Sequence, residues 1–295
     1  MAAVNIFWDP EGLQVDQLGA NRLVRLTDGD TPFVSLSIRM LSIDAPEVHY
    51  PGNAKPSKQD ARFKQLADWI QQNKAPIPAG LAAHLQPRLA TGHAGTLQEQ
   101  QGQQATAFFD DLLRRKLARP SKPPRSLFIR AADQHFDQYG RLLAYIAPSY
   151  SAKERQTLSR QDRATFNLLM VEAGWAASFP IYPSIPRYAD LVFLRNAAQQ
   201  AFDQPRGIWA DPLTLTGYEF RMCVRLYEVT RRLVAGATLS SRDRTSWVER
   251  YCVDTTTREV FSPQDYYKVQ PYNRIFVWPQ DIAEAVSTMN LVPAP

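Results

Sequence analysis

The sequence predicts an α+β fold. Two observations support this: alternating apolar and polar residues, typical of strands, occur over residues 20–47 and 126–150, and longer amphipathic stretches, typical of helices, lie between and after them. Runs of strands followed by runs of helices are the order expected of an α+β protein. Five short strands in the first 210 residues could close into a small barrel.

The first strands surround a turn. Residues 22–26, "RLVRL", form a short strand, and the "DGD" that follows is typical of a turn. Apolar residues then alternate with polar ones from Val34 to Met40, which predicts a half-buried strand. Pro46 ends this region, because proline cannot donate a hydrogen bond to a neighbouring strand.

Residues 48–105 predict a different structure. We expect "HYPGNAKPSKQ" to be a loop, "DARFKQLADWIQQ" a helix and "LAAHLQPRLA" a second short helix. The stretch "TGHAGTLQEQQGQQ" is polar and low in complexity, so we expect it to be exposed. An amphipathic helix follows in "ATAFFDDLLRRKLA".

The next segments predict two strands and two helices. "RSLFIRAADQHFDQYGRLLAYIAPS" predicts a strand pair with Gly140 in its turn, and "SAKERQTLSRQDRATFNLLMVEAGWA" a helix that Gly174 stops. "PRYADLVFLRNAAQQAFDQPRGIW" predicts a second helix.

Residues 211–295 change in character and suggest a separate, small β-rich module. "EFRMCVRLYEVTRRL", "SWVERYCVDTTT" and "NRIFVWP" are interpreted as strands, and "QDIAEAVSTM" as a closing helix with Asp281 near its start. The module is either an interaction module for a protein partner or a structural support.

The charge distribution indicates a polyanionic partner. The net charge is +5, yet residues 211–295 hold ten basic and ten acidic residues. Residues 48–125 hold 12 basic and 5 acidic residues, a local excess of 7. Nucleic acid would satisfy such a basic region, although a solvated basic surface gives the same count.

Cysteine, histidine and hydropathy patterns limit the class of protein. Cys223 and Cys252 could pair, but we interpret them as reduced, buried thiols. The four histidines lack the spacing of a zinc site. No apolar run reaches the roughly 18 residues of a membrane-spanning helix, so we expect no membrane partner. The N-terminus lacks the pattern of a secretory signal, which predicts a cytoplasmic location or export by a non-classical route.

Acids and arginines recur in three places: the 28–31 turn, the end of the third strand and the turn at 137–141. The motifs are "DGDT" (Asp28–Thr31), "IRMLSIDAPE" (Ile38–Glu47) and "DQYGRLLAYI" (Asp137–Ile146). Together with "VEAGWA" and "GIW" further on, they occur in an order that resembles the staphylococcal nuclease (thermonuclease) family. The resemblance covers residues 20–210 and says nothing about 211–295.

The resemblance implies a five-stranded OB-fold barrel with packed helices and calcium-dependent hydrolysis of DNA, RNA or both. The residues that it assigns to Ca2+ are Asp30, Asp44 and the carbonyl of Ala45. It assigns the activation of water to Glu47 and the grip on the scissile phosphate to Arg39 and Arg141. Tyr139 and Tyr182 match positions that pack around the bound nucleotide. Asp28 is interpreted as a turn residue only.

Elementary chemistry agrees with these residue types. Ca2+ prefers oxygen ligands, a carboxylate can take a proton from water, and an arginine fork can bind two phosphate oxygens. One geometric requirement follows from the spacing: alternation puts Arg39 and Asp44 on opposite faces of a strand. Their convergence therefore requires a bulge or bend between Met40 and Ile43.

Some positions depart from the family pattern, and two alternatives stay open. Gln138, Pro180 and Ala45 stand where the family often has lysine, tyrosine and a hydroxyl residue, which affects affinity and substrate preference. The insertion, residues 48–105, is either a basic lid over the substrate groove or a decoration without a catalytic role. The alternative function is that of a non-catalytic OB-fold nucleic-acid-binding or interaction protein.

Overall fold

The computed structural model of the chain describes residues 21–293. The chain forms two compact units. The first contains the residues up to Arg39 together with Ala131–Ala144, and the second contains Met40–Arg130 together with Tyr145–Pro295. The interpretation of the N-terminus as lacking a secretory signal concerns residues outside the described range.

The first unit begins with a hairpin of β1 (Leu23–Leu26) and β2 (Pro32–Val34). The two strands pair antiparallel, and the Thr27 N–H donates to the Thr31 carbonyl at 3.2 Å across the turn. The Arg25 guanidinium lies 3.6 Å from the centre of the Phe33 ring. This turn is the "DGDT" turn expected from the sequence.

A three-stranded sheet follows, with the order β3 (Ile38–Met40), β6 (Leu142–Pro148), β5 (Leu127–Phe136). Strands β5 and β6 each run from one unit into the other. They form the strand pair predicted for residues 126–150, and Gly140 adopts a φ of 73° in the turn between them, where glycine is favoured.

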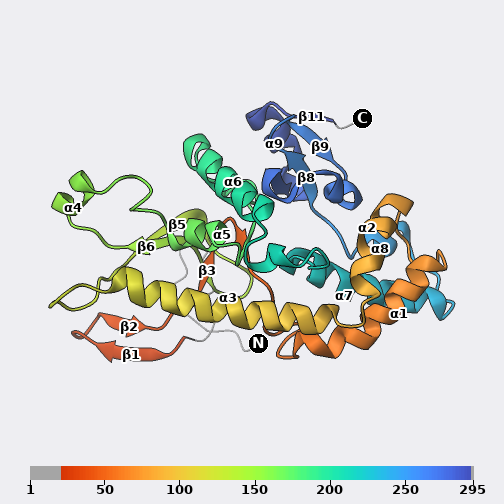
Figure 1. Cartoon of the computed structure of the whole chain (residues 1–295), viewed down its shortest axis with the longest axis horizontal. Coiled ribbons are helices and arrows are strands. Elements are labelled where there is room, and N and C mark those ends of the chain that lie inside the picture. The colour runs from red at the N-terminus through yellow and green to blue at the C-terminus, as the bar shows by residue number, and fades with distance from the viewer. Residues whose placement is uncertain (1–20, 294–295) are drawn as a thin grey trace. The chain divides into compact units, whose positions relative to one another are not determined.

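The second unit contains the remaining elements (Figure 1). In chain order they are β4 (Ile43–Asp44), the 3-10 helix η1 (Pro56–Gln59), α1 (Asp60–Gln71), α2 (Ala79–Leu89), α3 (Ala94–Leu117), α4 (Ala152–Thr157), α5 (Phe166–Glu172), β7 (Ala177–Ser178), α6 (Tyr188–Asp203), η2 (Gly207–Ala210), α7 (Gly217–Val234), α8 (Ser241–Thr245), β8 (Tyr251–Asp254), β9 (Glu259–Phe261), η3 (Pro263–Lys268), η4 (Pro271–Asn273), β10 (Arg274–Val277), η5 (Pro279–Asp281), α9 (Ile282–Met289) and β11 (Val292–Pro293).

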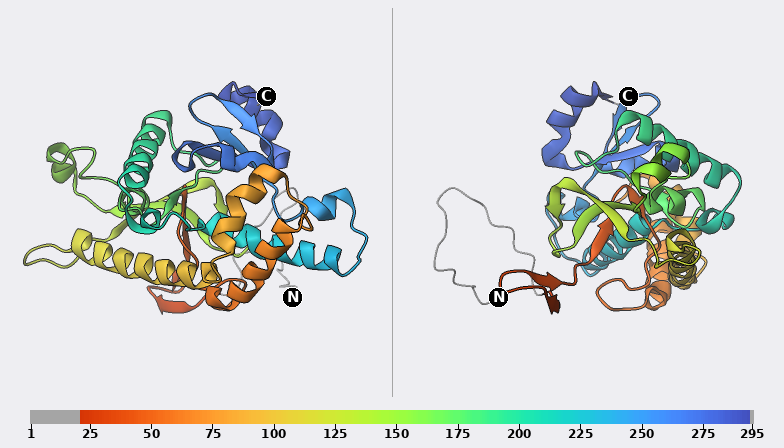
Figure 2. Two further views of the ribbon diagram at one scale, coloured as in Figure 1. Left: turned by 45° about the vertical axis from the view of Figure 1, so that its right-hand side comes forward. Right: turned by 90° about the vertical axis from the view of Figure 1, so that its left-hand side faces the viewer.

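The main hydrophobic core of the second unit joins the insertion to the C-terminal region. Helices α1, α2 and α7 lie side by side (Figures 1 and 2), and the Phe63 and Phe220 rings meet edge to face at 5.2 Å. Fully buried residues of this core come from both segments: Phe63, Leu66, Leu81, Leu85, Phe220, Leu226, Trp247 and Tyr266. The insertion is therefore part of the scaffold of this unit.

A second, smaller core lies in the C-terminal sheet, whose strand order is β10-β8-β9-β11. Strand β8 runs antiparallel to both β10 and β9, and β11 runs parallel to β9. Val253, Ile275, Val277 and Ala285 are buried between the sheet and α9. The strands expected around 251–254 and 274–277 and the closing helix are thus confirmed.

The interpretation of residues 219–233 as a strand is wrong, because these residues form α7. Phe220, Cys223, Val224 and Tyr227 recur at helical spacing and are buried. Thr216 begins the helix with a capping box: its side chain accepts from the Glu219 N–H, and the Glu219 carboxylate accepts from the Thr216 N–H at 3.0 Å. These helical signals outweigh the β propensity of the valines and threonine.

The polar stretch at 91–104 is not an exposed segment as expected, because it forms the first half of α3. Buried Gln101 donates to the Thr214 hydroxyl at 2.7 Å. Gly95 lets the helix pass close to η1: a Cβ there would be 2.2 Å from the Pro56 carbonyl oxygen. Small residues and amide hydrogen bonds therefore allow a sequence of low hydropathy to be buried.

Two further expectations need correction. The helix predicted for 151–174 is divided into α4 and α5; the Thr165 side chain caps α5 by accepting from the Leu168 N–H at 3.2 Å. The described strands form two-, three- and four-stranded sheets and no closed barrel. Mixed α and β structure is confirmed, and Gly174 stops α5 with a φ of 75° as expected.

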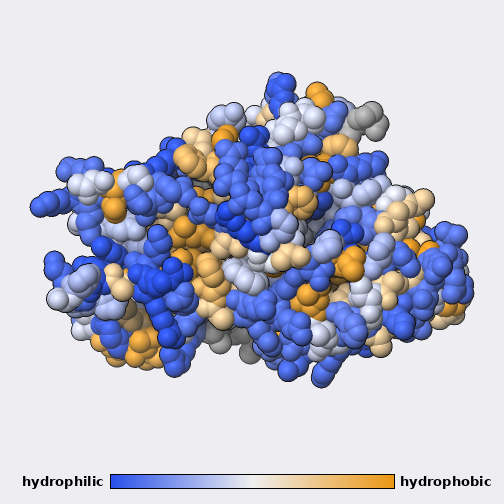
Figure 3. Space-filling model, in the orientation of Figure 1, coloured by the Kyte–Doolittle hydropathy of each residue, from blue (hydrophilic) through white to orange (hydrophobic). Residues whose placement is uncertain are grey.

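The two cysteines agree with the interpretation made from the sequence. Cys223 and Cys252 are free and buried. No helix in residues 21–293 combines the length and apolar character needed to cross a lipid bilayer. The face drawn in Figure 3 is mainly hydrophilic, with hydrophobic residues in small groups.

Candidate active site

The carboxylate loop, residues 44–47, carries Asp44, Ala45 and Glu47 in the second unit. Ser42 precedes it with a φ of 60°, so the chain bends before Ile43. Strand β4 then pairs antiparallel with β7, with Asp44 opposite Ala177. The bend required between Met40 and Ile43 is therefore confirmed.

Arg221 of α7 binds both acids of the carboxylate loop. Its Nη2 donates to Asp44 Oδ1 at 2.9 Å, and its Nη1 donates to Glu47 Oε1. Asp44 is fully buried, whereas the Glu47 and Arg221 side chains are 24% and 20% exposed. Burial opposes the charge on Arg221, but the two carboxylates outweigh it and raise the pKa of Arg221 above its usual value.

Gly217, the first residue of α7, lies against the same loop. A Cβ at Gly217 would lie 2.6 Å from the Ala45 carbonyl oxygen and 2.7 Å from Asp44 Oδ2. The two oxygen atoms therefore face one small space, and the backbone of α7 fills it. Only glycine can begin α7 in this position without displacing the loop.

Helix α3 supports the other side of the carboxylate loop. With its amide oriented to satisfy both neighbours, Gln98 accepts from the Glu47 N–H at 2.7 Å and donates to the Leu215 carbonyl at 3.0 Å. A Cβ at Gly102 would be 2.8 Å from the Glu47 carbonyl oxygen. The insertion thus fixes the backbone of Glu47, which is neither of the roles considered for it from the sequence.

The first unit holds Asp30 and Arg39. Asp30 lies in the exposed turn between β1 and β2, where its Oδ1 accepts from the Thr31 hydroxyl at 3.0 Å. The same turn lowers the pKa of Asp28 through hydrogen bonds with the Thr31 and Asp30 side chains. Arg39 lies half-buried in β3.

The arginine turn, residues 137–141, also belongs to the first unit and stabilises itself. The Asp137 carboxylate accepts from the Tyr139 N–H at 2.9 Å, the Arg141 N–H at 3.0 Å and the Arg141 Nε at 2.7 Å. Burial raises the pKa of Asp137, but these hydrogen bonds outweigh it and lower that pKa below 3.8. Tyr139 is 74% exposed, and the Arg141 side chain is 41% exposed.

Tyr182, expected from the resemblance to pack around the nucleotide, lies inside the protein. It is buried in the smaller core of the second unit, and its hydroxyl donates to Glu284 at 3.0 Å. Its role in the structure is to pack the segment after β7 onto α9. The structure brings Asp44, Ala45 and Glu47 together in one unit, whereas Asp30, Arg39, Tyr139 and Arg141 belong to the other.

The carboxylate loop does not fit a Ca2+ ion in this conformation. Its oxygen donors have the chemistry that Ca2+ prefers. However, the Arg221 guanidinium already holds Asp44 and Glu47, and Gly217 fills the space that Asp44 and Ala45 face. Within residues 21–293, no three His, Cys, Asp or Glu side chains form a group able to hold a metal.

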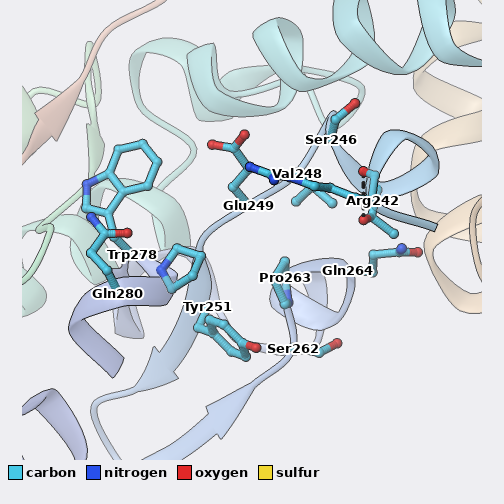
Figure 4. A pocket seen from close by; sticks show the side chains of 12 residues that line it. Arg242, Ser246, Val248, Glu249, Tyr251, Ser262, Pro263, Gln264, Trp278 and Gln280 are labelled. Atoms are coloured by element: carbon cyan, nitrogen blue, oxygen red, sulfur yellow. Dashed lines mark hydrogen bonds between the residues drawn. The ribbon is translucent and has the colours of Figure 1, made fainter. Parts of the chain in front are cut away.

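A cavity of about 830 Å³ lies in the C-terminal region, with Trp278 and Gln280 on one side and Arg242 and Gln264 on the other (Figure 4). None of the site residues expected from the sequence lines it. Its lining includes one basic residue, Arg242, and one acidic residue, Glu249, so it has no excess charge for an anionic substrate.

The carboxylate loop lies within a segment that matches a known protein family. Residues 37–211, more than half of the chain, match the family model described as staphylococcal nuclease homologue. The chain belongs to this family. The resemblance inferred from the motifs is thereby confirmed, although the matched residues begin after Asp30 and end before α7.

One curated relative is endonuclease YhcR of Bacillus subtilis (strain 168). It is 23% identical over 175 residues, which are 59% of this chain and 12% of the relative. The chain therefore spans only a small part of that protein's length.

Sequence reasoning missed the partners of the carboxylate loop: Gln98, Gly102, Gly217 and Arg221. The spacing of Thr216 and Glu219 is a capping-box signal that could have revealed the start of α7. No local signal relates Arg221 to Asp44, 177 residues earlier.

Proposed function

We propose that this protein is a nuclease that hydrolyses phosphodiester bonds of DNA, RNA or both. The observation that carries the proposal is the family match over residues 37–211, a segment that contains the acids and arginines of the motifs: Arg39, Asp44, Glu47 and Arg141. The name of the bacterial relative, an endonuclease, supports the same activity.

In this proposal each side chain has a chemical role. Glu47 accepts a proton from the attacking water, because a carboxylate that is partly exposed can reach solvent. Arg39 and Arg141 stabilise the charge that develops on the phosphate in the transition state. Arg141 can exchange its bond to Asp137 for one to phosphate, because the carboxylate and the phosphate are both anionic acceptors and the Arg141 side chain is 41% exposed.

We also propose that the activity depends on Ca2+. The ion would supply positive charge next to the phosphate, and the oxygen donors that the carboxylate loop offers it are Asp44 and the Ala45 carbonyl. Because Arg221 now binds Asp44 and Glu47, the calcium-bound state requires Arg221 to move away from the loop.

The same ion pairs favour a second candidate, a nucleic-acid-binding protein without catalysis. An arginine that permanently neutralises Asp44 and Glu47 would leave neither acid available for chemistry. The two functions differ in one measurable property, cleavage in the presence of calcium.

The test is cleavage of plasmid DNA, single-stranded DNA and RNA by the full chain in calcium, in magnesium and in EGTA. We expect cleavage in calcium that falls by about a hundredfold or more in Glu47→Gln, which removes the proton acceptor. Glu284→Gln is the matched control, because Glu284 lies in the C-terminal region.

Full activity in Glu47→Gln would contradict the catalytic role of Glu47. Binding of oligonucleotide in EGTA without cleavage in calcium would favour the second candidate.

A further inference from the structure

Arg225 and Arg250, two arginines near Arg221, have no role in the site described so far. Arg225 follows Arg221 by one turn of α7, so both lie on the same face of the helix. Arg250, immediately before β8, approaches this face: its guanidinium lies 5.8 Å from the centre of the Tyr218 ring on α7. Arg221, Arg225 and Arg250 are called the arginine cluster.

Aromatic rings hold Arg250 in place. Its guanidinium lies 4.0 Å from the centre of the Trp278 ring and 5.6 Å from that of Phe179. Contact with ring faces stabilises a cation and orients the plane of the guanidinium, but it leaves the in-plane N–H donors to be satisfied by other groups.

The donors of two members of the cluster are incompletely satisfied. The Nε atoms of Arg225 and Arg250 are buried, and neither has a hydrogen-bond partner among the described residues. Neither side chain forms an ion pair with a described carboxylate, whereas Arg221 forms two. A buried charged donor without an acceptor costs free energy, so such a pair indicates a ligand that supplies acceptors.

The charges of the cluster also require an anion. The described carboxylates that form ion pairs with the cluster are Asp44 and Glu47, and Arg221 engages both. Burial lowers the pKa of Arg250 to about 10, and the nearby Arg221 and Arg225 act in the same direction. Arg250 nevertheless stays charged at neutral pH, so the cluster holds more positive than negative charge.

We propose that Arg225 and Arg250 form a binding site for a backbone phosphate of a nucleic acid, contributed by the C-terminal region beside the carboxylate loop. A phosphodiester offers the two anionic oxygens that the arginine forks match, and the adjacent Trp278 gives the strand an apolar surface. This inference deepens the proposed function and rests on it. The residues lie outside the matched family segment, so this site is particular to chains with such a C-terminal region.

The test measures the affinity of the full chain for a fluorescein-labelled single-stranded oligonucleotide in EGTA, where no cleavage is expected, at several salt concentrations. We expect Arg225→Gln and Arg250→Gln each to weaken binding about tenfold, because each removes a charge-assisted contact. Each variant should also reduce the slope of log K against log salt by about 0.7.

Arg232→Gln is the matched control. Arg232 lies near the end of the same helix and is exposed. Its substitution therefore changes the net charge by the same amount as Arg225→Gln or Arg250→Gln. We expect its effect on affinity to be much smaller. Equal affinities and slopes for all three variants and the parent chain would overturn the proposal, as would the absence of oligonucleotide binding by the parent chain.

A second measurement does not depend on the stability of the variants. Phenylglyoxal modifies accessible arginines, and mass spectrometry identifies the sites. We expect the oligonucleotide to protect Arg225 and Arg250 but not Arg232 in the parent chain; equal modification with and without oligonucleotide would contradict the proposal.

The outcomes are separable from those of the proposed function. Inorganic phosphate is included as a competitor, and displacement of the oligonucleotide by an equal concentration of phosphate would identify a free-phosphate site and overturn the nucleic-acid assignment. If the variants weaken binding while the parent chain never cleaves, the phosphate site stands and the nuclease proposal fails. If the parent chain cleaves and the variants bind normally, the nuclease proposal stands and the phosphate site fails.

Discussion

The carboxylate loop and the arginine turn both pair acids with an arginine, but the arginine is local in the turn and comes from a distant helix in the loop. In the arginine turn, Asp137 binds Arg141 four residues later, and Tyr139 is exposed. In the carboxylate loop, Asp44 and Glu47 bind Arg221 from a distant helix, and α3 contacts the backbone of Glu47. A local motif is therefore sufficient for one segment, while the other depends on α3 and on α7, of which α7 lies beyond the residues that match the family model.

This difference predicts separate effects on activity and stability. Substitutions in the arginine turn should change catalysis with little change in folding. Substitutions around the carboxylate loop should change folding and catalysis together, since its partners also hold the core of the second unit.

The largest effect is expected for Arg141→Ala. Loss of an arginine that stabilises the transition state should lower the cleavage rate by about a hundredfold to a thousandfold. The thermal midpoint should change little, because the pair is only partly buried and the Tyr139 N–H and the backbone N–H of residue 141 still bind Asp137. Arg115→Ala is the control, since Arg115 forms an exposed pair with Asp111 at the same four-residue separation. A large loss of stability in Arg141→Ala would contradict the inference that the arginine turn contributes little to the stability of the fold.

Arg221→Met should mainly reduce stability. It leaves the fully buried Asp44 without the guanidinium, and breaking a buried ion pair lowers the free energy of unfolding by about 3 kcal/mol. We also expect the calcium concentration for half-maximal cleavage to fall, because a competing cation has been removed. Chemical denaturation with and without calcium measures both effects, with Arg232→Met as the control. An unchanged unfolding free energy would show that the pair does not hold the loop.

Gly102→Ala should have a smaller effect of about 2 kcal/mol on stability, typical of overpacking. The added methyl would lie 2.8 Å from the Glu47 carbonyl oxygen and 3.0 Å from a Val48 methyl. Movement of Glu47 should lower the cleavage rate as well. Gly29→Ala is the control, because nothing lies within 4 Å of a Cβ at Gly29. If both variants unfold at the same temperature, α3 does not fix the loop.

The smallest effect concerns pH. The folded-state pKa of Asp137 lies below its ordinary value of 3.8, so its stabilising contribution is present above pH 3.8 and is lost as pH falls through the lowered folded pKa. The difference in thermal midpoint between the parent chain and Asp137→Asn should therefore shrink as pH falls below 3.8. A difference that grows in acid would have the wrong sign. The magnitude should be below about 1 kcal/mol.

The sequence was sufficient where local chemistry decides the structure. Gly140 and Gly174 occupy turns that need positive φ, and the alternation before Met40 required the bend found at Ser42. The same holds for the acids and arginines of the motifs, because each motif is short and continuous.

The sequence was insufficient where distant segments decide the structure. The valines of α7 favoured a strand over its capping box and helical spacing, and burial against α1 and α2 stabilises the helix. Gln98 and Gln101 suggested exposure, yet inside the protein Gln98 binds Leu215 and Glu47, and the Gln101 amide nitrogen donates to Thr214. The pairing of Arg221 with Asp44 has no local signature at all, since it depends on how α7 docks.

The shared core of α1, α2 and α7 has an evolutionary consequence. Residues 63–89 and 218–266 bury one another, and neither segment could keep its apolar side chains from water alone. His84 on α2 and Tyr266 on η3 both bind Glu219 of α7, at 2.8 and 3.1 Å, which joins the same segments through polar groups. For the evolution of the chain, loss of either the insertion or the C-terminal region would expose the apolar side chains that the other buries, and the remaining segment would be prone to unfold and aggregate.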